Sequence, residues 1–216
     1  YAAISIRPRD WLVSTLRPEG LETLEALARA GGGAIVLGTH AGMTAWMPAA
    51  LIQLGLPLRL TQRKRVYPQT LMLLRRDGWI DRVLEYPDEG DEPARLKGLY
   101  DLLKQGQWLQ HTADYPDHRK GLTGRCFGGT VRCRRGPWAL GRLSGAPLVP
   151  ALVVLEADLR PRLLIGQPIR IDPRAPAQEA MTAAFGQYLS FLEAHLATRP
   201  WNLYVHLLSK SRVPVP

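Results

Sequence analysis

Residues 33–42, GAIVLGTHAG, decide the fold of this chain. Four apolar residues in a row, two of them β-branched, are typical of a short strand that is buried on both faces, as parallel strands are. A polar turn with a histidine follows the run at once, and residues 43–54 then predict a helix. A buried strand that leads into a helix is the basic unit of an α/β sheet, and ligands gather at the carboxyl ends of its strands.

Helix-like and strand-like segments alternate on both sides of this stretch. We expect helices over residues 17–29, 43–54, 69–76, 94–104, 138–144 and 178–198, and strands over residues 34–37, 56–60, 79–86, 107–110, 147–155 and 163–171. A polar loop is expected after residue 110, through Gly124. The alternation predicts an α/β fold with a mostly parallel central sheet flanked by helices. We expect a single domain over residues 1–216, with room for an N-terminal anchor ahead of Tyr1.

The composition is that of a folded and basic protein. Hydrophobic residues make up 46% of the chain and charged residues 22%, which argues against disorder. The formal net charge of +9 favours anionic partners such as lipid headgroups, phosphorylated molecules or nucleic acid. Aromatic residues are not interleaved with the basic clusters, so we expect no nucleic acid as a partner. No run approaches the roughly 20 apolar residues that a spanning helix needs.

His40 is the first candidate for chemistry. It follows the buried strand directly and stands between Gly38 and Gly42, whose lack of side chains lets a substrate approach the imidazole closely. A neutral histidine at such a place can take a proton from a hydroxyl group. The N–H groups that begin the following helix are candidates for stabilising an oxyanion. The alternative is a histidine that only caps the helix or fills the core.

The second candidate is the polar loop at residues 110–120, QHTADYPDHRK. Its two histidines and two aspartates fit no metal-ligand spacing, so we expect a solvated active-site loop and no metal. Two basic clusters, at residues 63–65 and 132–135, are candidates for binding phosphate. The alternative for both clusters is a solvated basic surface.

Four segments occur in a characteristic order: Gly-Leu-Glu at residues 20–22, the strand and histidine of residues 33–42, FGGT at residues 127–130 and GPWALGRLSGAPLVPA at residues 136–151. This order resembles the lysophospholipid acyltransferase superfamily, and most closely its lipid A biosynthesis late-acyltransferase branch. The last segment is the most specific of the four. The resemblance runs along nearly the whole chain.

The resemblance implies an acyltransferase of lipid biosynthesis. A fatty acyl group would move from a thioester on acyl carrier protein or coenzyme A to a hydroxyl or amine of a lipid or amphiphilic acceptor, with no further cofactor. His40 matches the histidine that deprotonates the acceptor, and Asp114 lies where the lipid A branch has an acidic residue after its strand. The implied location is peripheral, at the cytoplasmic face of the inner membrane, or cytoplasmic.

The same resemblance indicates which residues hold the substrate. Arg63 falls near a basic position, after the second strand, that is suited to an acceptor phosphate. Gly129 and Gly136 fall in the segment that lines the acceptor site. Arg132 joins them as a second candidate for a phosphate contact. We therefore predict His40 and Asp114 as catalytic residues and these four as substrate-binding residues.

The chain departs from the family pattern at one important position. The family has Asp or Glu five residues after the histidine, and this chain has Ala45 there. Loss of a carboxylate that orients the imidazole costs about 10⁴-fold in rate in hydrolase triads. Three explanations stay open: Ala45 is an engineered substitution, Asp114 or Asp117 supplies the carboxylate, or the fold serves another chemistry or only binds acyl chains or a membrane surface. A carboxylate within hydrogen-bonding reach of His40 would favour catalysis.

Overall fold

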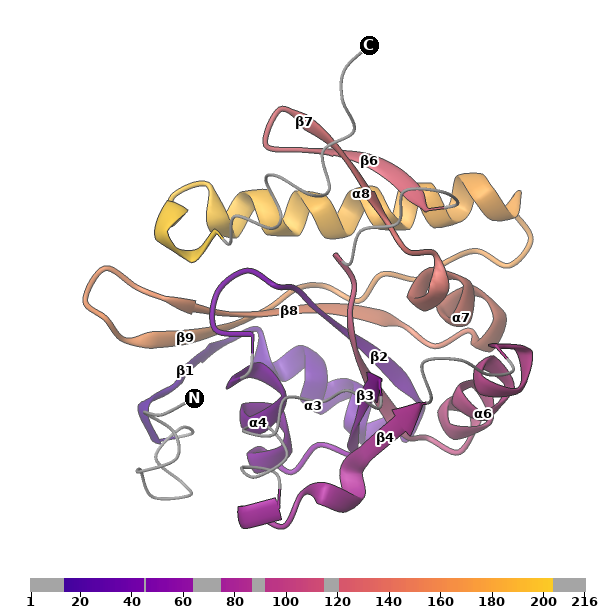
Figure 1. Ribbon diagram of the computed structural model, residues 1–216, viewed down its shortest axis with the longest axis horizontal. Helices are drawn as coiled ribbons and strands as arrows, with labels where there is room; N and C mark the ends of the chain where they lie inside the picture. The colour runs from indigo at the N-terminus through magenta and orange to yellow at the C-terminus, as the bar shows by residue number, and fades with distance from the viewer. Residues whose placement is uncertain (1–13, 45, 64–74, 87–91, 115–120, 204–216) are drawn as a thin grey trace.

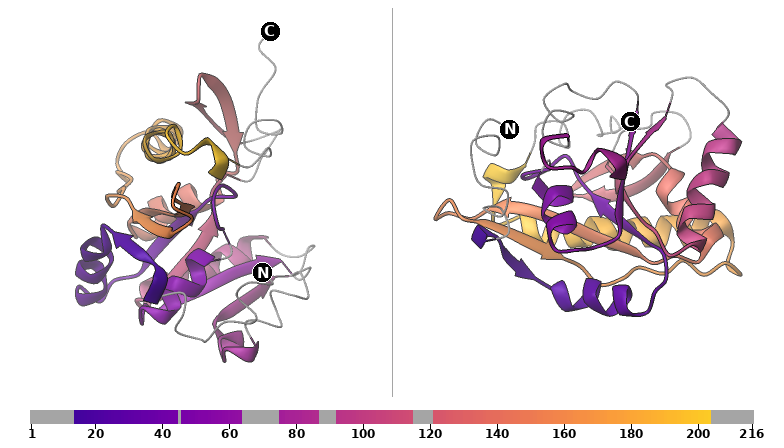
Figure 2. Two further views of the ribbon diagram at one scale, coloured as in Figure 1. Left: turned by 90° about the vertical axis from the view of Figure 1, so that its left-hand side faces the viewer. Right: turned by 90° about the horizontal axis from the view of Figure 1, so that it is seen from below.

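The computed structural model describes residues 14–44, 46–63, 75–86, 92–114 and 121–203. Within these ranges the chain has an α/β fold with one mostly parallel seven-stranded sheet and five α-helices (Figures 1 and 2). The helices are α3 (Leu21–Arg29), α4 (Trp46–Gln53), α6 (Glu92–Lys104), α7 (Gly136–Ser144) and α8 (Ala177–Leu196), with 3-10 turns η1 (Ile80–Arg82) and η2 (Pro200–Asn202). The strands are β1 (Arg17–Glu19), β2 (Ala34–Gly38), β3 (Leu58–Arg63), β4 (Val83–Tyr86), β5 (Trp108–Thr112), β6 (Leu122–Cys126), β7 (Gly129–Cys133), β8 (Leu148–Leu155) and β9 (Pro161–Ile165).

The expected mostly parallel sheet is confirmed. Its strand order is β1-β9-β8-β2-β5-β3-β4. The five strands from β8 to β4 run parallel, whereas β9 is antiparallel to β8, and β1 follows the direction of β9. The strand predicted from residues 34–37 is β2, which lies at the centre between β8 and β5. The carboxyl ends of β2 and β5 are therefore neighbours, with Gly38 paired to Thr112.

The central strand is buried on both faces, as its apolar run predicts. Ile35 and Leu37 belong to the core between the sheet and helices α6, α7 and α8. Ala34 and Val36 belong to the opposite core, which α3 and α4 cover. Figure 1 shows α8 lying along one face of the sheet, with α3 and α4 on the other. None of the described helices is both long and apolar enough to cross a membrane.

A two-stranded hairpin, formed by β6 and β7, packs against α8 (Figure 1). Its turn has positive φ angles at Phe127 (50°) and Gly128 (70°), and the Phe127 N–H donates a hydrogen bond to the Glu193 carboxylate of α8. A Cβ on Gly124 would lie 2.6 Å from Leu189 Cδ1, so any larger residue there would have to displace the end of the Leu189 side chain. The expected polar loop through Gly124 is wrong at this end, because packing on α8 overrides the weak strand propensity of the sequence.

Three expected boundaries are also wrong. The helix expected over residues 17–29 begins only at Leu21, because Arg17–Glu19 pairs with β9 as an edge strand. The strand expected over 79–86 begins at Val83, after a 3-10 turn. The strand expected over 163–171 is Pro161–Ile165, and Ile169 adds only an isolated bridge to Leu148. Most of the helix expected over 69–76 lies outside the described residues.

The entry to the central strand depends on a close contact at Gly33. A Cβ there would lie 2.1 Å from the carbonyl oxygen of Leu103, near the end of α6. We expect Gly33→Ala to lower the free energy of unfolding by about 1–3 kcal/mol, the usual cost of overpacking. Gly32→Ala is the matched control, since nothing lies within 4 Å of its added Cβ, and its effect should stay within about 0.5 kcal/mol. Urea unfolding followed by circular dichroism measures both, and equal stabilities would contradict the contact.

Candidate active site

The two predicted catalytic residues lie side by side at the carboxyl edge of the sheet. His40 stands two residues after the end of β2, and Asp114 stands two residues after the end of β5. The register of the two parallel strands brings both turns together. His40 Nδ1 lies 2.8 Å from Asp114 Oδ1. The Asp114 side chain is 1% exposed and the His40 side chain is 34% exposed, so the imidazole lies between the buried carboxylate and solvent.

The second oxygen of Asp114 is fixed by the same turn. Oδ2 accepts a hydrogen bond from Thr39 Oγ1 at 2.7 Å and another from the backbone N–H of His40 at 2.8 Å. Thr39 is itself buried, and its hydroxyl accepts the N–H of Ala41. One carboxylate oxygen of Asp114 therefore contacts the imidazole, and the hydrogen bonds to the other oxygen fix the orientation of the carboxylate. Thr39 was not predicted as a site residue, although a hydroxyl immediately before the histidine is a visible signal.

Helix α8 holds this turn from above through a buried tyrosine. Tyr188 Oη donates a hydrogen bond to the carbonyl oxygen of Gly38 at 2.9 Å, and that oxygen also accepts the N–H of Ala113, the residue after β5. Burial raises the pKa of Tyr188, so the phenol stays protonated as a donor. A Cβ at Gly38 would lie 2.7 Å from Met47 Cε. The absence of a side chain at Gly38 therefore lets the end of β2 approach Met47 of α4 closely. Sequence alone gave no signal for Tyr188, because it lies 150 residues away.

The contact with Asp114 determines the chemistry of the imidazole. Because a carboxylate accepts the hydrogen bond at Nδ1, the neutral ring carries its proton on Nδ1 and its lone pair on Nε2. The hydrogen bond to Asp114 raises the pKa of His40 from its ordinary 6.5; burial opposes this and the negative charge of Asp114 adds to it. His40 is therefore an oriented base that is stronger than an isolated histidine.

The backbone N–H groups of residues 40–43, between β2 and α4, are engaged within the fold, and an oxyanion site at the N–H groups that begin α4 stays a prediction. The N–H of Ala41 is bound to Thr39 Oγ1, that of Gly42 to the carbonyl oxygen of Asn202, and that of Met43 to the carbonyl oxygen of Val153. The N–H of His40 is bound to Asp114. All four donors serve the fold, because α4 begins only at Trp46 and the preceding turn is tied to β8 and η2.

Another histidine, His111 on β5, has its pKa shifted in the opposite direction from that of His40. His111 Nδ1 lies 3.2 Å from Thr61 Oγ1, whose hydroxyl donates to the carbonyl oxygen of Gln110 at 2.8 Å. Desolvation, together with the positive charges of Arg95 and Arg134, lowers the pKa of His111 to about 4. The ring is therefore neutral at pH 7, and His111 is a polar but uncharged neighbour at this edge of the sheet.

The other predicted substrate residues are distributed over several elements. Arg63 is the last residue of β3, paired to Tyr86 of β4, and its side chain lies outside the described residues. Gly129 and Arg132 belong to β7, where Arg132 Nε donates to Thr123 Oγ1 at 3.4 Å across the hairpin. Gly136 is the first residue of α7. Their predicted roles in binding substrate stay predictions, because the positions of these residues in the fold do not test them.

Several residues of the sequence argument cannot be placed. Ala45, residues 64–65 of the first basic cluster, and residues 115–120 of the polar loop, with Asp117 and His118, lie outside the described residues. Within the described ranges, no three His, Cys, Asp or Glu side chains come together in a way that could hold a metal ion. Asp114, one of the carboxylates that the sequence offered as partners for His40, lies within hydrogen-bonding reach of its ring.

We expect the two histidines to titrate on opposite sides of their ordinary pKa of 6.5, with His40 above it and His111 at about 4. Asp114→Asn should lower the pKa of His40, because it removes the charged hydrogen-bond acceptor that raises it. The same substitution should leave His111 titrating near 4. Two-dimensional NMR of the imidazole resonances against pH measures both values. An unchanged pKa of His40 in Asp114→Asn would refute the pairing.

Comparison with known proteins leaves this geometry as the main guide to function. A scan of the chain against protein-family models gives no match, and a search of the curated proteins finds no similar sequence. The function is therefore inferred from the site residues and from the resemblance in segment order.

Proposed function

We propose that this protein is an acyltransferase that moves a fatty acyl group from an acyl thioester, on acyl carrier protein or coenzyme A, to a hydroxyl or amine of a lipid or amphiphilic acceptor. The observation that supports it most is the 2.8 Å contact between His40 Nδ1 and Asp114 Oδ1. This contact supplies the orienting carboxylate that the family pattern has at the position of Ala45. A histidine that served only as a helix cap would need no buried carboxylate behind its ring.

The reaction needs one base and one acid, and His40 can be both. His40 Nε2 takes the proton of the acceptor hydroxyl while its oxygen attacks the thioester carbonyl. The buried Asp114 carboxylate stabilises the imidazolium that forms, as the carboxylate does in hydrolase triads. When the tetrahedral intermediate collapses, the carbon–sulfur bond breaks and the imidazolium returns the proton to the leaving thiolate. The products are the acylated acceptor and a free thiol, and His40 is neutral again.

The alternative is a family member that binds acyl chains or a membrane surface without turnover. It would show saturable binding of a fatty acyl ligand and no release of thiol from any thioester donor. The buried and fully hydrogen-bonded Asp114 favours catalysis over this alternative, because burying a charged carboxylate beside a histidine costs free energy that binding alone does not require.

We expect His40→Ala to lower the rate of acyl transfer by about 10²–10⁴-fold, the usual contribution of a general base. Asp114→Asn should lower it by up to about 10⁴-fold, because the amide can hold the wrong tautomer of the ring. His195→Gln is the matched control, since His195 lies on α8 with its ring against Phe191. The measurement is thiol release from acyl carrier protein and coenzyme A thioesters, with folding checked by circular dichroism. Full activity of His40→Ala would eliminate the proposal.

The pH dependence gives an independent check. Only neutral His40 can accept a proton, so kcat/KM should fall as the pH falls through the raised pKa of His40. In Asp114→Asn the acid limb of the residual activity should move to a lower pH, because the pKa of His40 falls when its carboxylate partner is lost. Rate profiles between pH 5 and 9 cover roughly two pH units on either side of a histidine pKa, so they show the shift of the acid limb. An acid limb that stays in place would assign the titration to another group.

A further inference from the structure

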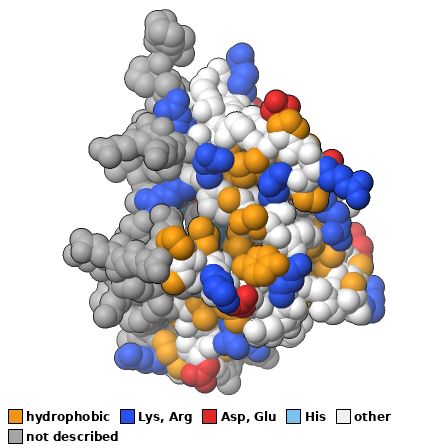
Figure 3. Space-filling model, turned by 90° about the vertical axis from the view of Figure 1, so that its right-hand side faces the viewer, with side chains coloured by type: hydrophobic (Ala, Val, Ile, Leu, Met, Phe, Trp, Pro, Cys, Tyr) orange, Lys and Arg blue, Asp and Glu red, His pale blue; other side chains and the backbone are white. Residues whose placement is uncertain are grey.

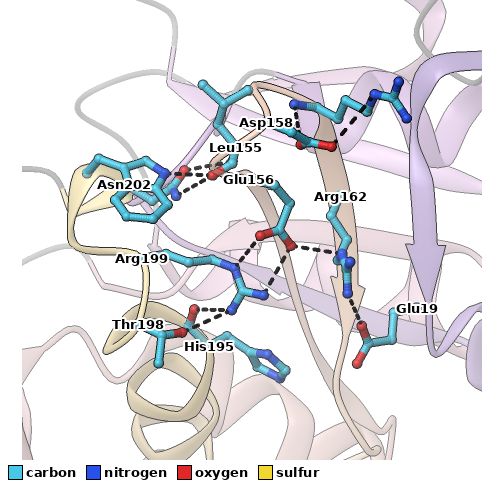
Figure 4. Close-up of polar contacts among 11 residues, drawn as sticks. Glu19, Leu155, Glu156, Asp158, Arg162, His195, Thr198, Arg199 and Asn202 are labelled. Carbon is cyan, nitrogen blue, oxygen red and sulfur yellow. Dashed lines mark hydrogen bonds and ion pairs between the residues drawn. The ribbon is translucent and has the colours of Figure 1, made fainter.

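The segment after α8 crosses the end of β8 and reaches the turn that carries His40. Asn202, the last residue of η2, is only 6% exposed. Its side chain bonds both backbone groups of Leu155, the last residue of β8: Oδ1 accepts the N–H at 2.8 Å, and Nδ2 donates to the carbonyl oxygen at 2.9 Å (Figure 4). An amide that uses its acceptor and a donor on one residue has a single orientation, so these bonds fix the position of Asn202 relative to β8.

The backbone of Asn202 holds the turn after His40. Its carbonyl oxygen accepts the N–H of Gly42 at 2.7 Å, and the N–H of Met43 donates to the carbonyl oxygen of Val153, also at 2.7 Å. Gly42 has a φ angle of +65°, and a Cβ there would lie 2.2 Å from the Val153 carbonyl oxygen. Because glycine permits both the angle and the close approach, the turn lies tightly against β8 and η2, two residues beyond the imidazole.

An ion pair fixes the start of η2. The guanidinium of Arg199 meets both carboxylate oxygens of Glu156, the residue after β8, with Nε and Nη2 each at 3.0 Å (Figure 4). Both side chains are 19% exposed, and a bidentate, mostly buried pair is stronger than an ordinary surface pair. Arg199 Nη1 also donates to the carbonyl oxygen of His195, near the end of α8. The carbonyl oxygen of Arg199 accepts the N–H of Asn202 at 2.9 Å, so the pair secures the residue that carries Asn202.

Glu156 is held from its other side by a second arginine. Arg162 of β9 lies 2.8 Å from Glu156 Oε1 and reaches Glu19 of β1 at 3.1 Å. The hydrogen bond from Arg199 lowers the pKa of Glu156, burial opposes this, and the charges of both arginines add to it. Glu156 is therefore ionised at neutral pH, and its pair with Arg199 persists there. Glu19 joins the same network through Arg162, which makes it a control position.

We propose that Asn202 is a positioning residue, which holds His40 in place through the N–H of Gly42. The fold needs such a hold, because His40 follows β2 and precedes α4 and lies in neither. Loop backbone moves more than strands and helices do, and a displacement of about 1 Å can remove much of the effect of a catalytic group. Asp114 fixes the turn at His40, and Asn202 fixes it two residues later.

The alternative is that Asn202 only anchors the chain after α8. Its loss would then lower the stability of the protein and leave the imidazole on Asp114. The pKa of His40 distinguishes the two roles, because the hydrogen bond to Asp114 is the largest cause of its rise. The inference rests on the proposed function for the reaction that His40 performs, whereas the position of the imidazole is measured without any acyl transfer.

The first test is Asn202→Ala, which removes both bonds to Leu155 without changing any charge. The pKa of His40, measured by NMR of the imidazole resonances, should fall from its raised value, because the loosened turn no longer holds the ring on Asp114. In the thiol-release assay kcat should fall roughly 10–10²-fold while KM stays within about twofold, since the base is displaced and substrate binding is not altered.

Ser144→Ala is the matched control. Ser144 is also buried, and its hydroxyl also has two bonds to backbone groups: it donates to the carbonyl oxygen of Leu140 at 2.7 Å and accepts the N–H of Ala146 at 3.2 Å. It belongs to α7, on the face of the molecule where hydrophobic side chains lie among Lys and Arg (Figure 3). Melting temperatures from circular dichroism compare the loss of stability in the two variants. Ser144→Ala should leave the pKa of His40 unchanged and kcat within about twofold, because distant sites act independently.

A second variant, Glu156→Gln, tests the ion pair and decides the question if Asn202→Ala does not fold. It keeps the shape of the side chain but removes the charge that holds Arg199. The pKa of His40 and kcat should therefore fall in the same direction as in Asn202→Ala. Glu19→Gln removes a carboxylate from the same network and should change neither value.

Three results would overturn the inference. One is a folded Asn202→Ala variant that keeps the pKa of His40 or the kcat of the parent. Another is an equal fall of both values in Ser144→Ala, and the third is an effect of Glu19→Gln as large as that of Glu156→Gln, which would be one of charge alone. The expected changes in the pKa of His40, with no thiol release in any protein including the parent, would support the hold on His40 and remove the proposed function alone.

Discussion

The arrangement of the site depends on the carboxylate of Asp114. It is almost fully buried and accepts three hydrogen bonds, from the imidazole and N–H of His40 and from the hydroxyl of Thr39. A buried carboxylate without partners costs far more free energy than its hydrogen bonds return individually, so the three contacts form together or not at all. Each donor comes from the turn after β2, whereas the acceptor comes from β5. The carboxylate thus joins the two central strands at their carboxyl ends.

The remainder of the structure keeps those two turns in register. β2 and β5 pair from Ala34 with Trp108 to Gly38 with Thr112, and both cores pack on this pair. Tyr188 ties the carbonyl oxygen of Gly38 to α8. On the other side, carbonyl oxygens of η2 and of the end of β8 accept hydrogen bonds from the N–H groups of Gly42 and Met43. The backbone N–H groups of residues 40–43 are thus used in holding the proposed base, His40, in place.

Sequence patterns predicted the elements with strong local signals. The run at residues 34–37 marked the central strand, and the periodicity of residues 94–104 and 178–198 marked α6 and α8, because apolar spacing reflects burial directly. The β6–β7 hairpin was missed, since its strands are set by contact with α8 rather than by their own composition. The pairing of His40 with Asp114 stood as one of several alternatives, because spatial proximity across 74 residues follows from strand order, which local patterns do not contain.

Under the proposed function, the orienting acid follows a neighbouring strand, and this has a consequence that the pattern of the resembled family lacks. An acid five residues after the histidine is held by the geometry of one turn and helix, so it forms as soon as that segment does. Asp114 reaches His40 only when β2 and β5 pair in the observed register, because each of the two residues lies two positions beyond the end of its strand. Thr39 and Gly38 then act as register constraints as much as site residues. The base is oriented only in the fully assembled sheet, so packing of the central strands and strength of the base are governed by the same contacts.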